Sequence, residues 1–246
     1  MPNPQAASID PAEVARFEAL AAEWWNPLGK FKPLHLLNPA RLAYMRDHLA
    51  AHFARDRSSL RPFEGLRLLD IGCGGGLVSE PFARMGATVA GIDAAARNVA
   101  IAASHAAEFD VPVDYRNIAA EDLAAAGERF DVVLALEIVE HVADLGAFLG
   151  TCAALTRPGG ALFVGTLNRT PQAFVKAIVG AEYVLGWLPR GTHDWRKFVR
   201  PSELVAALRP HGVTVRDLSG LNYSLLDDSW SVGRDLSVNY LAYAAK

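Results

Sequence analysis

The sequence contains few of the features that mark exported or membrane-spanning proteins. It has only 2 cysteines in 246 residues, far apart and in no CxxC or Cys/His spacing, which argues against a disulfide framework and a zinc site. No uncharged apolar run reaches transmembrane length, and the N-terminus lacks the basic and apolar regions of a secretory signal. These absences predict a protein of the reducing cytoplasm.

The sequence also lacks an excess of positive charge. The 24 Lys and Arg residues are outnumbered by 27 Asp and Glu residues, giving a net charge of -3, so no overall basic field favours binding to nucleic acid. A hydrophobic content of 51% and a charged content of 21% are ordinary for a globular protein with one sizeable core. One enzyme-sized domain without a nucleic-acid partner is therefore expected.

From about Leu66 onward, strand-like and helix-like hydrophobic periods alternate. The predicted strands are residues 67–71, 88–93, 113–117, 131–136, 161–166, 213–218 and 238–244, with helices such as 94–109 and 145–156 between them. This alternation predicts a Rossmann-like α/β fold of seven strands, mostly parallel and covered on both faces. Ligands of such sheets bind beyond the carboxyl ends of the strands.

Two segments lie outside this alternation. Residues 1–60 are predicted to form an N-terminal helical cap, with one helix beginning at Asp10-Pro11 and another at Asn38-Pro39. Residues 61–246 form the predicted main domain, which contains a long insertion at 168–200. Because the insertion is too apolar to be disordered, its length predicts a functional role.

A glycine-rich stretch, RLLDIGCGGGLVSEPF, follows the first predicted strand. A dinucleotide fingerprint, G-x-G-x-x-G, fits Gly72 and Gly74 but finds Leu77 where the third glycine belongs. The backbone of such a loop can approach a ligand closely. Asp70 beside it is a poor neighbour for a pyrophosphate and a good one for an ammonium group.

Acidic residues follow the next two strands. Asp93 ends the second strand, where a carboxylate can accept hydrogen bonds from ribose hydroxyls. After the third strand, Ala120-Glu121-Asp122 offers a backbone N–H and a carboxylate to an adenine edge. Over residues 66–166, this order resembles the class I S-adenosylmethionine-dependent methyltransferases. The alternative is that the glycines only form a tight turn and Asp93 only caps the next helix.

Two carboxylates and an imidazole follow the fourth strand. Glu137, Glu140 and His141 have the i, i+3 and i+4 spacing that places side chains on one face of a helical turn. Such a set could perform acid–base chemistry or bind a hard divalent ion such as Mg²⁺ or Mn²⁺, which would help a bound hydroxyl to ionise. Alternatively, the three residues cap backbone groups and position the cofactor.

Further motifs extend from about Phe17 to Tyr240. They are WWNP, FKPLH, NPARL, LLDIGCGGG, EIVEHV, GTLNR, VGAEYVL, GTHD and VNY. Together they resemble the ubiquinone biosynthesis O-methyltransferase family. The resemblance implies a seven-stranded class I methyltransferase sheet with an N-terminal helical lid and a helical insertion after strand 5.

The resemblance also implies an activity and its residues. The expected reaction is S-adenosylmethionine-dependent methylation of the catechol-type hydroxyl of 2-polyprenyl-6-hydroxyphenol and of 3-demethylubiquinol. With the loop and strand-end residues above, the expected cofactor contacts are Arg41, Gly72, Gly74, Asp93, Glu121 and Leu136. Glu137, Glu140 and His141 match a metal set of eukaryotic relatives, and His141 is the candidate base. Arg41 is expected to bind the carboxylate of the cofactor; the alternative is a surface arginine paired with Asp47.

The insertion suggests where a polyprenylated substrate enters. From 168 to 200 it carries six basic and two acidic residues, or +4, against -3 for the whole chain. An apolar helical stripe is predicted at Phe174, Ala177, Ile178, Ala181, Leu185 and Leu188. We expect this helix to lie in an anionic membrane surface, at the inner face of the plasma membrane, where other enzymes of ubiquinone biosynthesis are expected partners. The alternative is a lid helix packed on the domain.

Three other functions remain open from the sequence. Another small-molecule class I methyltransferase, acting on carbon or nitrogen, would share the cofactor site but has no need of the apolar, basic insertion. An NAD oxidoreductase would need the missing third glycine. A non-catalytic scaffold could lose Asp93 or the loop glycines, and this chain keeps both.

Overall fold

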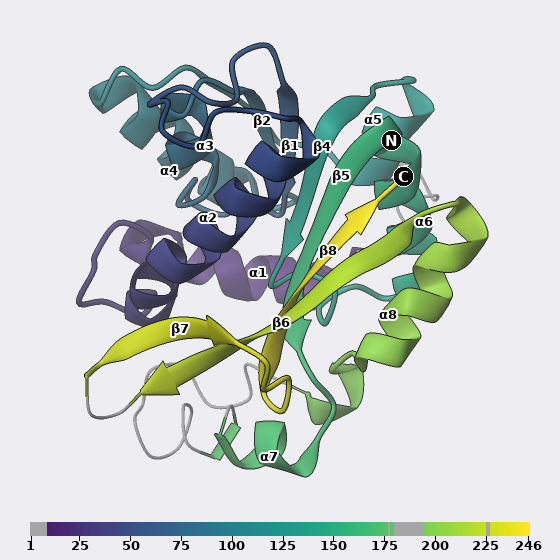
Figure 1. The fold of residues 1–246 in the computed structure, drawn as a ribbon. Helices are drawn as coiled ribbons and strands as arrows, with labels where there is room; N and C mark the ends of the chain where they lie inside the picture. Colours follow the sequence, from purple (N-terminus) through teal and green to yellow (C-terminus); the bar gives the residue numbers. More distant parts are fainter. Residues whose placement is uncertain (1–8, 177, 180–193, 225–226) are drawn as a thin grey trace.

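The computed structural model describes residues 9–176, 178–179, 194–224 and 227–246. Its centre is one eight-stranded sheet of order β3-β2-β1-β4-β5-β8-β6-β7 (Figure 1). The strands are β1 (Arg67–Ile71), β2 (Thr88–Ile92), β3 (Val113–Arg116), β4 (Phe130–Leu136), β5 (Thr156–Leu167), β6 (Thr214–Ser224), β7 (Ser229–Gly233) and β8 (Asn239–Ala245). The Rossmann-like α/β fold predicted from the sequence is confirmed.

The sheet changes direction beyond β5. Strands β1 to β5 pair in parallel, whereas β8 runs antiparallel to β5 and β6, and β7 runs antiparallel to β6. The sequence predicted seven strands and missed β7. This strand lies at the edge of the sheet and none of its residues is buried, so its sequence, SWSVG, lacks the apolar run that reveals the central strands.

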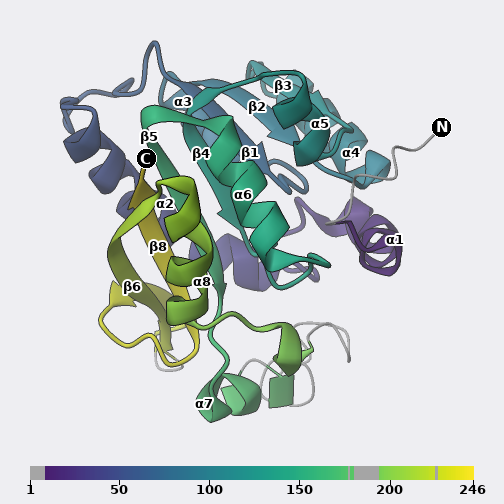
Figure 2. The same cartoon turned by 90° about the vertical axis from the view of Figure 1, so that its right-hand side faces the viewer.

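Helices cover both faces of the sheet (Figure 2). One face packs against α2 (Lys32–His52), α3 (Ser79–Arg84) and α4 (Ala96–Glu108), and the other against α5 (Ala120–Ala125), α6 (Leu145–Leu155) and α8 (Pro201–Leu208), which is followed by the short helix η4 (Arg209–His211). Side chains alternate along β4: Val132 and Leu134 face the first layer, Val133 and Ala135 the second. The strand ends are thereby held rigidly from both sides.

The N-terminal segment divides into two parts. Helix α1 (Pro11–Leu20) begins after Asp10, whose side chain accepts from the N–H of Ala12 as predicted, and is followed by η1 (Ala21–Glu23). The prediction that the next helix begins at Asn38-Pro39 is wrong. Helix α2 begins at Lys32, because Pro33 supplies an equally good start, and Pro39 lies inside it.

The two N-terminal helices are buried differently. No residue of α1 is buried, whereas α2 buries side chains such as Met45 and Leu49 in the core on one face of the sheet. Helix α1 lies across the carboxyl ends of the strands (Figure 1). Of the cap predicted at residues 1–60, α2 therefore packs in a layer of the main domain, and we call α1 with the adjoining η1 the N-terminal lid because α1 lies over the pocket.

Only part of the predicted insertion is described. It includes α7 (Pro171–Ala173) and η3 (Trp195–Lys197). Of the predicted apolar stripe, Phe174 is exposed and Ile178 packs against the cluster that contains Phe198, while Ala177, Ala181, Leu185 and Leu188 lie outside the described residues. Among the helices that the structure describes, none is long and apolar enough to cross a membrane.

Candidate cofactor and methyl-transfer site

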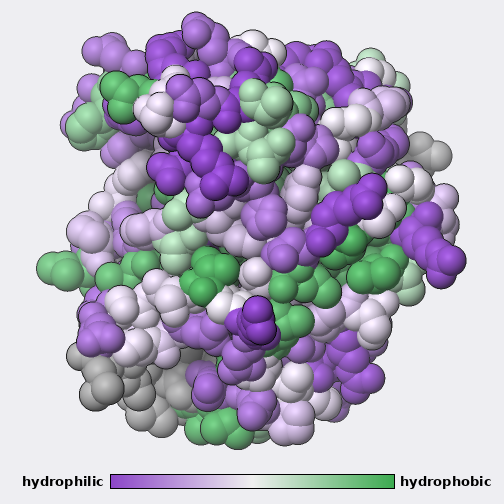
Figure 3. All heavy atoms as spheres, viewed as in Figure 1, coloured by the Kyte–Doolittle hydropathy of each residue, from purple (hydrophilic) through white to green (hydrophobic). Residues whose placement is uncertain are grey.

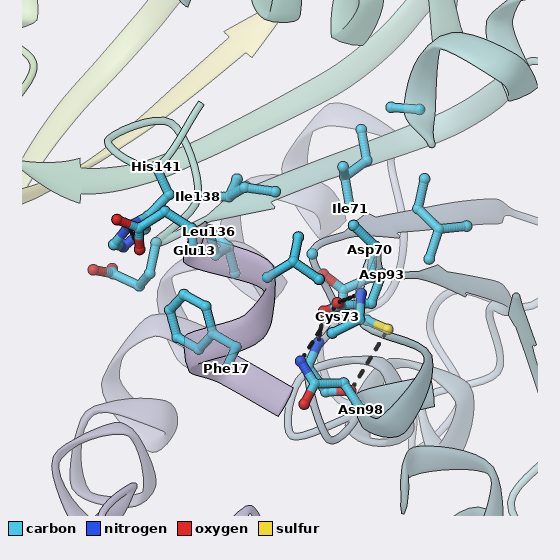
Figure 4. A pocket seen from close by; sticks show the side chains of 18 of the residues that line it. Glu13, Phe17, Asp70, Ile71, Cys73, Asp93, Asn98, Leu136, Ile138 and His141 are labelled. Atoms are coloured by element: carbon cyan, nitrogen blue, oxygen red, sulfur yellow. Dashed lines mark hydrogen bonds and ion pairs between the residues drawn. The ribbon is translucent and has the colours of Figure 1, made fainter. Parts of the chain in front are cut away.

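A pocket lies at the carboxyl ends of β1, β2 and β4, under α1 (Figure 4). It is lined by eight of the nine predicted site residues: Arg41, Gly72, Gly74, Asp93, Glu121, Leu136, Glu137 and His141. Figure 4 shows Glu13 and Phe17 of α1 beside His141, across the pocket from Asp70 and Asp93. The pocket thus brings the predicted cofactor residues and the predicted base together.

The glycines of the loop after β1 have a structural cause. Gly72, Gly74 and Gly76 all have positive φ angles, of 71°, 54° and 89°, which favour glycine. A Cβ atom at Gly72 would lie 2.6 Å from Ile138, and one at Gly74 would overlap the indole of Trp24. A larger residue at Gly72 or Gly74 would clash with other side chains of the protein. These positions therefore require glycine whether or not a ligand approaches the loop.

Asp93 is fixed by the same loop. Its Oδ2 accepts from the Gly74 N–H at 2.9 Å, and its Oδ1 accepts from the Ala95 N–H at 2.8 Å and from the Asn98 amide at 3.4 Å. Burial raises the pKa of Asp93, and these hydrogen bonds oppose that rise. The carboxylate therefore joins the glycine loop to the end of β2 and to Ala95, the residue before α4.

A buried cation lies near the loop. Arg41 is 4% exposed, and its Nε donates to Asn38 Oδ1 at 2.8 Å. Among the described residues no carboxylate oxygen lies within 4.0 Å of its guanidinium, and Asp47 pairs with Arg46 instead. Burial lowers the pKa of Arg41, while the charges of Glu137 and Asp70 oppose this. A buried guanidinium without a close carboxylate is well suited to an anionic ligand group.

Asp70 is buried beside the glycine loop. It accepts a hydrogen bond of 2.6 Å from the Ser79 hydroxyl. Burial raises its pKa to about 6, despite this hydrogen bond and the charge of Arg41. A cationic ligand group next to Asp70 would favour the ionised form. Arg41 and Asp70 together thus provide one positive and one negative group in the same pocket, as a zwitterionic amino acid moiety requires.

The segment after β4 is a turn, as the sequence predicted, and no residue from 137 to 142 is helical in spite of the helical spacing. Glu137 has a φ of 53°, and its N–H donates to the Gly165 carbonyl at 2.8 Å, which bends the chain at the strand end. The three side chains after this bend have different surroundings. His141 points toward α1, where its Nδ1 lies 3.1 Å from Glu13 Oε2 and the edge of the Phe17 ring packs at right angles to the imidazole.

Glu140 has a different environment. It is 3% exposed and does not line the pocket; its Oε2 accepts from the Thr166 hydroxyl at 2.7 Å, and its Oε1 has no hydrogen-bond partner among the described residues. No group of three or more His, Cys, Asp or Glu side chains in the described part of the chain could hold a metal ion. The arrangement of Glu137, Glu140 and His141 does not fit the expected Mg²⁺ set, and we assign no step to a metal.

The pKa shifts reflect this arrangement. Burial, together with the charge of Glu140, raises the pKa of Glu137. Burial alone would lower the pKa of His141, but the hydrogen bond to Glu13 and the charges of Glu140 and Glu137 raise it overall. The same hydrogen bond is the main cause of the lowered pKa of Glu13. His141 is thereby made a stronger base with a defined orientation.

Several residues of the site were not found from the sequence. No pattern in the sequence marked Glu13, Phe17 or Asn98 as pocket residues, and Ile138 was noted only as part of the EIVEHV motif. Glu13 meets His141 across 128 positions of sequence. Trp24 was noted only as part of the WWNP motif, which gave no indication that its indole lies on the glycine loop.

Comparisons with known proteins define the class. A family model described as a methyltransferase domain matches residues 42–218, which is more than half of the chain. A solved magnesium protoporphyrin IX methyltransferase from Synechocystis, with bound SAM, aligns with a TM-score of 0.61 and 17% identity over 98% of this chain and 99% of that one. The fold is that of a class I methyltransferase.

Closer relatives define the family. A ubiquinone biosynthesis O-methyltransferase from Mesorhizobium japonicum is 57% identical over 100% of this chain and 99% of its own length. Another, from Parvibaculum lavamentivorans, is 56% identical over 98% of this chain and 95% of its own length. The chain belongs to the ubiquinone biosynthesis O-methyltransferase family.

Proposed function

We propose that this chain binds S-adenosylmethionine in the pocket under α1 and transfers the methyl group to a catechol-type hydroxyl of a ubiquinone precursor. The expected acceptors are 2-polyprenyl-6-hydroxyphenol and 3-demethylubiquinol. The observation that carries the proposal is that the buried Arg41, the loop-bound Asp93 and the Glu13-paired His141 line one pocket in a chain of this family. Relatives that cover nearly the whole chain are named for this pathway.

The pocket offers a group for each part of the cofactor. Arg41 would bind its carboxylate and Asp70 its ammonium group. Asp93 would accept the ribose hydroxyls, with the backbone of Gly72 and Gly74 alongside. The adenine contacts would come from Glu121 and Leu136, the latter 8% exposed at the end of β4. When bound, the cofactor supplies an electrophilic methyl group on a sulfonium.

The catalytic work of the protein is to ionise and align the acceptor. The tautomer of His141 that donates from Nδ1 to Glu13 carries its lone pair on Nε2, which takes the proton of the acceptor hydroxyl. The bound cofactor would supply the methyl carbon to this ionised oxygen, with its sulfur as the leaving group. Phe17 and Ile138 line the same pocket and help to exclude water.

The proposal is tested by mass spectrometry of a short-chain 3-demethylubiquinol incubated with the protein and methyl-labelled S-adenosylmethionine. A labelled methyl group on the ring oxygen is expected. Absence of label, or label on carbon, would contradict the proposal. A parallel reaction with a chelator separates two routes of ionisation: turnover that persists supports His141 acting alone, and turnover lost while S-adenosylhomocysteine still binds would give that role to a metal.

Delivery of a polyprenylated acceptor is part of the proposal. Phe174, Val175 and Val179 have exposed side chains, at 45%, 58% and 39%. A few hydrophobic side chains lie at the lower edge of the molecule where α7 is found, apart from a larger hydrophobic band across the middle of this face (Figure 3). Residues 168–200 also carry a charge of +4. The exposed apolar side chains and this positive charge support docking on an anionic membrane surface, where the chain would also meet other enzymes of ubiquinone biosynthesis.

Vesicle flotation tests the docking. Wild type is expected to float with vesicles that contain phosphatidylglycerol, and a variant with Lys176→Glu and Arg190→Glu is expected to stay in the soluble fraction. If wild type and variant both ignore the vesicles, the membrane role of this segment fails while the methyl-transfer proposal is unaffected.

A further inference from the structure

The tryptophan of the WWNP motif lies against the glycine loop. The indole of Trp24 is 7% exposed and stacks on Phe31, with ring centroids 3.8 Å apart and planes within 4°. A Cβ atom at Gly74 or Gly75 would overlap Trp24. The loop that would hold the cofactor is therefore covered on one side by a side chain from the N-terminal segment.

The same indole is hydrogen-bonded toward Asp93. Trp24 Nε1 donates to Asn98 Oδ1 at 2.9 Å, and Asn98 Nδ2 donates to Asp93 Oδ1 at 3.4 Å. Because an indole N–H can only donate, it fixes the amide of Asn98 with its oxygen toward Trp24 and its NH₂ group toward Asp93. Asn98 is 2% exposed, so water does not compete readily for its amide.

The geometry points to Trp24 as a positioning residue for the cofactor, acting on the ribose through Asn98 and Asp93. This inference rests on the S-adenosylmethionine-binding part of the proposed function. A carboxylate has about four acceptor positions, and the protein fills two on Oδ1 and one on Oδ2 of Asp93. The hydrogen-bond relay from Trp24 through Asn98 holds Oδ1 of Asp93. The remaining acceptor position on Oδ2 is then presented to the ribose hydroxyls in one orientation.

The neighbouring tryptophan provides a matched comparison. Trp25 Nε1 donates to the Gly75 carbonyl at 2.9 Å, and its ring stacks on His105 at 3.4 Å. Trp25 thus anchors the N-terminal segment to the same loop, but its indole N–H is not part of the path to Asp93. The variants Trp24→Phe and Trp25→Phe each remove one indole N–H, and only the first breaks the relay.

The test is calorimetric binding of S-adenosylhomocysteine and of its 2′,3′-dideoxyribose analogue to the full chain. Trp24→Phe is expected to weaken binding of S-adenosylhomocysteine by about fivefold to tenfold, as the loss of a buried hydrogen bond predicts. Binding of the analogue, which cannot donate to Asp93, is expected to change by less than about twofold. Trp25→Phe is expected to affect both ligands equally.

A second variant tests the same relay in case Trp24→Phe fails to fold. Asn98→Leu keeps a helix-forming side chain of similar size in α4 and removes both hydrogen bonds of the relay. It is expected to reproduce the ribose-dependent loss of Trp24→Phe. If both variants weaken the two ligands equally, or if neither weakens S-adenosylhomocysteine, the positioning role is overturned. Because no acceptor is present, failure of the proposed O-methylation would leave this result unchanged.

Discussion

The central sheet and the N-terminal lid are held in place by different forces. Strand β4 buries five successive residues, Val132 to Leu136, in the two main apolar cores. Helix α1 buries none: its cap, Asp10, pairs with Lys197, and Glu13 and Phe17 contact His141. Its only apolar packing on a core cluster among the described residues is that of the partly buried Leu20. The contrast suggests that the sheet supplies stability, while docking of the lid completes the site.

Replacement of His141 is expected to have the largest effect on turnover and to leave the sheet intact. His141→Ala is expected to lower turnover by about 10²–10⁴-fold, the usual contribution of a general base. Binding of S-adenosylhomocysteine is expected to stay within experimental error, because the predicted cofactor groups lie elsewhere in the pocket. Steady-state kinetics and calorimetry measure the two. Unchanged turnover would remove His141 from catalysis.

A pair of truncations compares the two regions directly. Leu134→Ala, at a fully buried position of β4, is expected to lower the free energy of unfolding by about 3 kcal/mol. Phe17→Ala in α1 is expected to lower it by less than about 1 kcal/mol and yet to reduce turnover, since Phe17 packs on His141. Urea denaturation and kinetics give the comparison. Equal destabilisation by the two changes would contradict the division of roles.

The carboxylate of Glu13 is expected to have an intermediate effect. Because its hydrogen bond helps to raise the pKa of His141, Glu13→Gln lowers that pKa, so the acidic limb of the kcat profile moves to lower pH. Above that limb, turnover is expected to fall on the order of tenfold as the charge-assisted bond is lost. Glu23→Gln, in the adjoining η1, serves as the control. An unmoved acidic limb would show that Glu13 only anchors the lid.

The smallest effect concerns pH and Asp70. With a pKa of about 6 in the structure described, Asp70 must lose a proton to pair with a cationic ligand group. Pairing with that group would lower the pKa of Asp70, so affinity for S-adenosylhomocysteine is expected to be full well above pH 6 and to fall as the pH drops below it. The loss from about pH 7 to about pH 5 is expected to reach up to about tenfold. Asp70→Asn, measured by the same calorimetry, is expected to flatten this dependence; an equally steep profile would place the ammonium group elsewhere.

The elements that the sequence predicted are those with strong local signals. The buried strands and the glycine loop were found because their hydrophobic period and composition are local properties. Strand β7 was missed because an exposed edge strand has little hydrophobic periodicity. The start of α2 was misplaced because Pro33 and Pro39 could each be the proline of a first helical turn.

The site residues that belong to local motifs were predicted from the sequence. Those that only folding brings to the pocket were missed. Asp93 and Gly72 follow strand ends that the sequence reveals. The spacing of Glu137, Glu140 and His141 fits a turn as well as a helix, so spacing alone could not show that Glu140 lies outside the pocket. The contacts of Glu13 with His141 and of Trp24 with Asn98 join distant parts of the chain, and no local pattern encodes them.

The most direct test of the division between sheet and lid is amide hydrogen exchange with and without S-adenosylhomocysteine. In the proposed site the ligand would contact residues beneath α1, so binding is expected to slow exchange in Pro11–Leu20 by at least about tenfold, while β4 stays as protected as it was. If exchange in α1 is unchanged by a saturating ligand, the helix is not a lid over this site.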